Sequence, residues 1–206
     1  MKKEIQIKVP KSFSAVTLRD YLPFQKDLDN YGEDGEEAVV AVVLHHLCGI
    51  NPKWIRQIDT DTYTKIKGNV NDLLKKEDYP LKRTITLDGV EYGFEPDLSK
   101  MDYGMYVDIS SYKDLEINEK WAEIMSILYR PITEKIGNQY RIKDYNGEIH
   151  DKFLDVTMDV HLGALFFFIH LRTSLLKTTL NYLMESEEIP HNIKSTLAKS
   201  GEVTPR

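Results

Sequence analysis

The longest apolar run of the chain extends from Val160 to Leu171, between Asp159 and Arg172. Because a helix needs roughly 20 apolar residues to cross a bilayer, this run is too short to span a membrane. Beyond it, the apolar residues follow the spacing of an amphipathic helix: Leu175, Leu176, Leu180 and Leu183. The pattern therefore predicts a central apolar helix that begins near Thr157. Its first half would be buried on every side, and its second half would be exposed to solvent on one side.

The apolar run needs at least two packing surfaces, because consecutive apolar residues cover the whole circumference of a helix. We expect the inner side of the helix to consist of Leu162, Leu165, Phe166, Ile169 and Leu176. The outer side, which would cover a β-hairpin or a neighbouring subunit, consists of Phe167, Phe168 and Leu171. A shared outer side would be typical of a chain that forms a homo-oligomer or binds a helical partner.

A β-hairpin is predicted at about residues 83–95, where apolar and polar residues alternate on both sides of Asp88-Gly89. Both residues of this dipeptide tolerate the positive φ that a two-residue hairpin turn requires. The same alternation predicts a short strand over Ile5–Val9 and another within residues 139–147, which ends in an Asn-Gly turn.

Several other segments have the apolar spacing of helices. A first helix would be capped by Ser14 or Thr17, and a second, before Gly49, leaves almost no polar face and indicates a core helix. Residues 118–130 form an amphipathic pattern that Pro131 would stop. A further helix would place these residues on one side: Ile66, Val70, Leu73 and Leu74.

These elements predict an α+β fold that is mainly helical, with the hairpin and one or two short additional strands packed on the central helix. We expect a single globular domain over residues 1–186, in which the hairpin forms a subdomain at about residues 81–97. A weak helix and flexible tail would follow over residues 187–206.

Composition narrows the classes of function. The 206 residues are 41% hydrophobic and 29% charged, which is typical of a folded protein, and the formal net charge is -6. An acidic chain is poorly suited to neutralise phosphates, so we expect no nucleic-acid partner. The single cysteine, Cys48, excludes an intramolecular disulfide and suits a reducing cytosol.

No residue cluster in the sequence indicates a catalytic site or a cofactor-binding site. His45, His46 and Cys48 have neighbouring positions, but zinc needs four ligands and no further cluster supplies them, so core packing is the plainer interpretation. His161 and His170 are nine residues apart and would lie on opposite helix faces, one in the core and one at a polar boundary. We therefore expect no metal, no cofactor and no catalytic residue.

Aromatic side chains supply the candidate protein interface. Tyr92, Phe94, Tyr103 and Tyr106 gather around the hairpin, where they would form either a core or an exposed anchor for a partner. With the outer side of the last helix, the candidate interface consists of Tyr92, Phe94, Tyr103, Tyr106, Phe167, Phe168 and Leu171.

The order of segments resembles that of small proteins of tailed bacteriophages, over about Val9 to Leu183. The segments that carry the resemblance are "VPKSFSAVTLRDYLPF", "GINPKWIRQI", "YTKIKGNVNDLL", "LDGVEYGFEPDLSKMDYGMYVDI", "WAEIMSILYRPIT" and "DVTMDVHLGALFFFIHLRTSLLKTTLNYL". The first third also resembles tail assembly chaperones, which are short acidic helical proteins that bind the tape-measure protein. The last twenty residues lack the Lys-Lys or Gly-Asn pair at which many such chaperones are extended by frameshifting.

The resemblance implies a non-enzymatic assembly chaperone that acts in the host cytoplasm on a tape-measure-like protein, without a membrane partner. The alternative is a permanent virion component, such as a head–tail connector, a ring subunit or a tail-base subunit. A third hypothesis is an enzyme or anti-host effector whose site is assembled from distant residues such as His45, Glu91 and His150.

Overall fold

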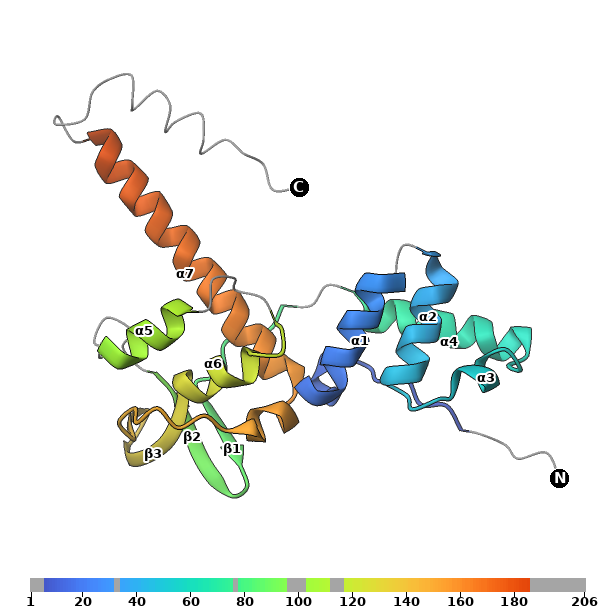
Figure 1. Ribbon diagram of the computed structural model, residues 1–206, viewed down its shortest axis with the longest axis horizontal. Helices are drawn as coiled ribbons and strands as arrows, with labels where there is room; N and C mark the ends of the chain where they lie inside the picture. The colour runs from blue at the N-terminus through green and yellow to red at the C-terminus, as the bar shows by residue number, and fades with distance from the viewer. Residues whose placement is uncertain (1–5, 32–33, 76–77, 96–102, 112–116, 186–206) are drawn as a thin grey trace. The chain divides into compact units, whose positions relative to one another are not determined.

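The computed structural model describes residues 6–31, 34–75, 78–95, 103–111 and 117–185 (Figure 1). These residues form seven α-helices and one four-stranded antiparallel sheet, so the predicted α+β class is confirmed. The chain divides into two compact units, Met1–Leu165 and Phe166–Arg206. The predicted tail over residues 187–206 lies outside the described residues.

The first part of the chain is helical. It contains the 3-10 helix η1 (Phe13–Ala15) and the α-helices α1 (Leu18–Tyr31), α2 (Glu36–His46), α3 (Pro52–Ile55) and α4 (Thr60–Leu73). The Thr17 hydroxyl caps α1 by accepting the Asp20 N–H at 3.2 Å. A shared core joins α1, α2 and α4 and includes Phe24, Val40, Val43, Leu44, Ile66, Val70 and Leu73. This core confirms the predicted buried character of α2 and the predicted apolar face of α4.

The strand expected over Ile5–Val9 is not found in its described part, because residues 6–10 have no regular secondary structure. Ile7 and Val9 instead pack, partly buried, against the helical core. Alternating apolar residues serve equally well to anchor an irregular segment when no neighbouring strand offers hydrogen bonds.

The sheet contains β1 (Thr84–Leu87), β2 (Val90–Phe94), β3 (Tyr129–Ile136) and β4 (Gln139–Ile142), in that spatial order. The predicted hairpin is confirmed, since β1 pairs with β2 and the turn has φ values of 50° at Asp88 and 78° at Gly89. β4 confirms the strand predicted within residues 139–147, although it ends at Ile142, before the Asn-Gly pair.

The strand β3 was missed by the sequence pattern. Helix α6 (Trp121–Leu128) passes directly into β3, so the helix ends before Pro131 rather than at it. Pro131 lies inside the strand opposite Tyr92, and its carbonyl accepts the Lys143 N–H at 2.9 Å. Proline lacks an N–H, but its carbonyl oxygen can still accept a hydrogen bond in the sheet.

One face of β2 is part of the core. Tyr92 and Phe94 are 3% and 1% exposed, and their rings pack edge-on against Phe153 at 6.0 Å and Tyr129 at 5.2 Å between ring centroids. They point to one side of the hairpin, as expected for residues two apart on a strand. Their burial removes Tyr92 and Phe94 from the candidate interface and assigns them to the core.

The opposite face of β2 is covered by Tyr140. A Cβ atom at Gly93 would overlap the Tyr140 ring, so the ring can lie over β2 only because position 93 is glycine. The Tyr140 hydroxyl lies 2.7 Å from the Phe94 carbonyl O and 3.0 Å from that of Arg83. The β3–β4 pair is thereby attached to the hairpin.

Helix α7 (Met158–Glu185) begins where the sequence predicted, after the 3-10 helix η4 (Asp151–Asp155). Its start is joined to the start of α1 by an antiparallel bridge between Thr17 and Thr157. In this bridge the Leu18 N–H donates to the Val156 carbonyl at 3.0 Å, and the Met158 N–H donates to the Val16 carbonyl at 2.8 Å.

In the first turns of the last helix, the buried side is not the predicted one. The buried residues there are Met158, Asp159, Val160, His161, Gly163 and Ala164. A Cβ at Gly163 would lie 2.7 Å from the Pro80 carbonyl O, so the close approach of that segment fixes which side faces inward. Leu162 and Leu165 are only half-buried, and Ile169 is 45% exposed. Because Phe166 begins the second unit, the central position of the whole helix stays a prediction.

His161 is the core histidine of α7, and His170 is exposed, as the predicted opposite faces require. The His161 Nε2 atom lies 3.1 Å from the Phe153 carbonyl O. Because a carbonyl only accepts, Nε2 must carry the hydrogen. Burial disfavours the imidazolium form and lowers the pKa of His161 to about 4, although hydrogen bonds to the carbonyls of Phe153 and Val156 favour it.

Gly89→Val should lower the free energy of unfolding by about 1 kcal/mol or more, because a β-branched residue resists the φ of 78° at this turn position. Chemical denaturation monitored by circular dichroism measures the change. The control is Gly68→Val, since Gly68 lies within α4 and has no heavy atom within 4 Å of an added Cβ. Equal losses in the two variants would contradict the turn assignment.

The stability of the protein should fall between pH 6.5 and 4 partly through His161. In this interval the His161 imidazole is protonated in the unfolded chain but stays neutral in the folded chain. Acidification therefore favours unfolding by about 3 kcal/mol in total. His161→Gln keeps a donor near Nε2 and should flatten this part of the pH profile, measured by denaturation at several pH values. His170→Gln should leave the profile unchanged, and an unaltered profile in His161→Gln would refute the assignment.

Candidate functional site

A groove beside α1 has a volume of about 1270 Å³. We call it the α1 groove. Its apolar lining consists of Leu22 and Pro23 of α1, Leu154 of η4, Leu162 and Leu165 of α7, and Ile117. Its charged lining consists of Arg19, Lys26, Asp29, Glu119 and Lys120. Apolar residues together with charges of both signs are common on protein-binding surfaces.

Backbone and side-chain contacts fix the walls of the α1 groove. The bridge between Thr17 and Thr157 positions the starts of α1 and α7, and the Lys120 N–H donates to the Asn118 side chain at 2.9 Å in the turn before α6. Arg19 forms a two-bond ion pair with Asp155, with contacts of 2.8 and 3.0 Å. Its hydrogen bonds lower the pKa of Asp155.

Polar side chains form a ladder along α1. The Tyr21 hydroxyl donates to Gln25 at 2.7 Å, and the Gln25 amide donates to Asp29 at 2.9 Å, each step covering one helical turn. Burial raises the pKa of Tyr21, and the Asp29 carboxylate raises it further, so the phenol stays neutral. The ladder leaves these groups hydrogen-bonded to one another beside the groove, where they provide no activated nucleophile.

The remaining residues of the candidate interface belong to α5 and α7. Tyr103, on α5 (Tyr103–Ser111), is 83% exposed, and Val107 on the same helix is 42% exposed. Phe167 and Phe168 are half-buried in the second unit, and their ring centroids lie 5.6 Å apart. The side chains of Tyr106 and Leu171 lie outside the described part of the structure.

The two histidines of α2 lie outside the buried core: His45 is exposed, contrary to the predicted core packing, and His46 is partly buried. His45 Nδ1 lies 3.2 Å from the Ile50 carbonyl O, and His46 Nε2 lies 2.7 Å from an Asp27 carboxylate oxygen. Partial burial raises the pKa of the Cys48 thiol, so it is a poor thiolate donor. Among the described residues, no group of three or more His, Cys, Asp or Glu side chains could hold a metal ion.

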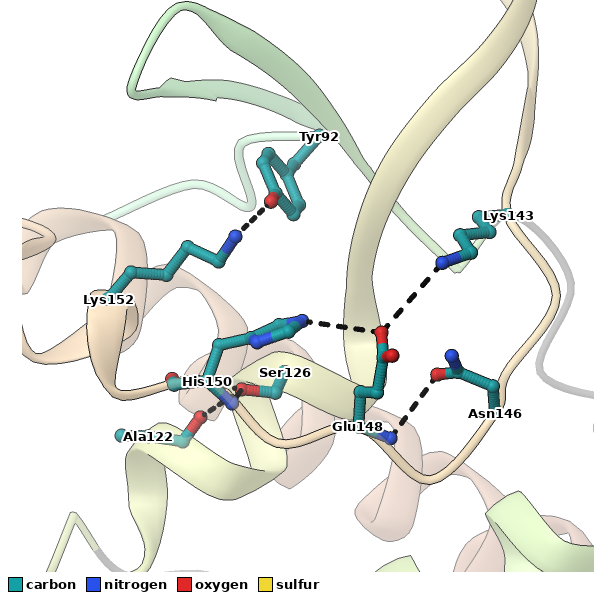
Figure 2. A network of polar contacts seen from close by, with 8 residues as sticks. All are labelled: Tyr92, Ala122, Ser126, Lys143, Asn146, Glu148, His150 and Lys152. Carbon is teal, nitrogen blue, oxygen red and sulfur yellow. Dashed lines mark hydrogen bonds and ion pairs between the residues drawn. The ribbon is translucent and has the colours of Figure 1, made fainter.

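A second polar cluster surrounds the loop before η4 (Figure 2). The Ser126 hydroxyl accepts the His150 N–H at 3.0 Å and lies 3.0 Å from the Ala122 carbonyl O. Ser126 therefore contacts the backbone of His150 rather than its imidazole, and the two do not form a nucleophile–base pair. The His150 Nε2 atom is 4.0 Å from Glu148, too far for a direct hydrogen bond.

The other members of this cluster hold the loop in place. The Asn146 side chain accepts the Glu148 N–H at 3.2 Å. A side-chain hydrogen bond with Asn146 and the charge of Lys143, whose amine is 3.8 Å away, lower the pKa of the Glu148 carboxyl. The Lys152 amine donates to the Tyr92 hydroxyl and lies 4.8 Å from the centroid of that ring (Figure 2). These polar groups therefore have a structural role, which is to hold the loop in place.

The three distant residues of the enzyme hypothesis are each engaged separately. Glu91 pairs with Lys135 across the sheet, His45 contacts the Ile50 carbonyl, and His150 lies in the loop before η4. The α1 groove itself was missed by sequence reasoning. The only signal for it was the apolar face of α7 formed by Leu162 and Leu165, which the pattern assigned to the core.

Within the part of the chain that the structure describes, none of the helices has the length and apolar composition needed to span a membrane. Comparisons of the chain with protein-family models, with curated proteins and with solved structures found no match.

Proposed function

We propose that this chain is a non-enzymatic assembly protein of tailed bacteriophages that acts in the host cytoplasm as a chaperone. Its partner would be a long helical protein of the tape-measure type, held in the α1 groove. The observation that carries the proposal is the groove, whose lining combines apolar residues from α1, η4 and α7 with charged residues. An amphipathic helix is the element that such grooves commonly bind.

The size of the α1 groove supports a helical partner. The volume of about 1270 Å³ exceeds the roughly 400 Å³ that one turn of a helix about 10 Å across occupies, so the groove has room for part of a helix. Half-buried Leu162 and Leu165 would become covered by such a helix. Their covering contributes roughly 25 cal/mol per Å² of apolar surface removed from water.

The phage context rests on the resemblance of the segment order to small tailed-phage proteins. A permanent virion component, such as a connector or tail-base subunit, would need a similar binding surface. The two functions differ in what happens after assembly, because a chaperone leaves and a component stays.

Leu22→Asp should weaken the complex with the long helical tail protein encoded by the same genome by at least about tenfold, because a carboxylate would be desolvated against the partner helix. The complex is measured by co-expression followed by titration of the purified proteins. Leu22 is already partly exposed in the free chain, so the variant should fold. Val90→Asp, at a 45% exposed position of the hairpin, is the matched control. Equal affinity of both variants would rule out the groove.

Mass spectrometry of purified phage particles distinguishes the two fates. The chaperone function predicts that this chain is absent from finished particles and present in lysates during assembly. A fixed copy number per particle would reject the chaperone in favour of the virion component.

A further inference from the structure

The two edges of the sheet differ in how they are protected. β1 and β4 are its outer strands, so each has a neighbouring strand on one side only (Figure 1). β4 carries the exposed Arg141, and the ladder between β3 and β4 is interrupted by a register shift. Charges and irregular pairing of this kind hinder an edge strand from pairing with another chain. β1, with the sequence TITL, contains no charge and no proline and pairs with β2 in continuous register.

The free edge of β1 carries backbone groups that are available for pairing. The Phe94 N–H donates to the Arg83 carbonyl at 2.8 Å, so Arg83 directs its carbonyl toward β2. Because successive residues of a strand alternate in this respect, the N–H and C=O groups of Thr84 and Thr86 point away from β2. No backbone bond among the described residues outside the ladder uses these groups. β1 can therefore accept one further strand.

Unpaired charges of opposite sign flank β1. Arg83 precedes the strand and Asp88 follows it, and both are exposed and form no ion pair with another described residue. The neighbouring charges of Lys82 and Glu91 are already engaged in ion pairs within the chain. An antiparallel strand of the same sequence brings its own Asp88 beside Arg83, and its own Arg83 beside Asp88. The strand that fits β1 by charge is therefore another β1.

We propose that two copies of this chain associate through antiparallel pairing of their β1 strands. When Thr84 of one copy pairs with Thr86 of the other, the two residues can exchange both of their outward N–H···O bonds. The two-fold axis then passes next to Ile85, and Arg83 of each copy lies one position from the residue opposite Asp88 of the other. The contact is isologous, and the two four-stranded sheets join into one continuous sheet.

The long-range repulsion between the two acidic copies does not prevent this contact. Each chain has a net charge of -6, but salt screens charges that lie farther apart than about 8 Å at physiological ionic strength. The close pairs of Arg83 and Asp88 across the contact are screened least. The dimer also does not rest on the proposed function, because none of the residues that line the α1 groove belongs to β1.

Loss of a single backbone donor tests the strand pairing. Sedimentation of the wild-type chain at up to about 100 micromolar should show an approach to twice the chain mass of 23.9 kDa. Thr86→Pro should weaken association by at least about tenfold, because proline removes the outward N–H while the bonds between β1 and β2 remain. Thr86→Val keeps this N–H and should associate like the wild type. A wild-type chain that stays monomeric, or equal association of the two variants, would overturn the proposal.

An exchange of charges tests the antiparallel arrangement without a proline. Arg83→Glu and Asp88→Lys should each dissociate at least about tenfold more readily, because like charges then meet across the contact. An equimolar mixture of the two variants should associate again, since opposite charges meet at both ends. Residues 83 and 88 of one chain are about 16 Å apart along an extended strand, so a contact within the chain cannot cause this rescue.

Circular dichroism melting checks that every variant is folded, including Asp88→Lys, whose residue 88 must adopt a φ of 50°. A mixture of the folded charge variants that stays monomeric would overturn the antiparallel pairing. The same result follows if each charge variant alone associates as tightly as the wild type.

Discussion

The antiparallel bridge between Thr17 and Thr157 is the contact on which the rest of the first unit depends. It fixes the starts of α1 and α7, the two helices that supply most of the groove lining. Leu18 and Met158, both fully buried, lie next to the bridge and exclude water from its hydrogen bonds. The exposed Arg19–Asp155 ion pair adds little to the stability of the bridge, since solvent screens the attraction between the two charges.

Local signals predicted much of the fold. The Asp88-Gly89 turn, the buried helix α2 and the start of α7 all follow from spacing and turn chemistry within a few residues. The pattern failed where a local signal had two meanings. Pro131 was interpreted as a helix stop although the chain had already become a strand, and the alternation at Ile5–Val9 was interpreted as a strand without a partner strand.

The candidate site was much less predictable, because its lining comes from segments far apart in the sequence. Leu22 and Leu162 are unremarkable apolar residues until the bridge brings α1 and α7 together. Amphipathic spacing shows which residues share a helix face but not whether that face meets the core or solvent. The close approach of Pro80 to Gly163 decides this for α7, and no short-range pattern encodes it. For the same reason the sequence left open whether Tyr92 and Phe94 fill the core, as they do, or form an exposed anchor.

The bridge can form only late in translation, because its two residues are far apart in the sequence. Thr17 leaves the ribosome about 140 residues before Thr157, which is roughly 7 to 28 s at ordinary rates of translation. During this interval α1 can pack on α2 and α4, whose core is complete by Leu73, but the start of α1 still lacks its strand-like partner. The nascent chain is thus expected to carry a preformed helical core that waits for the last third of the polypeptide before its first residues are secured.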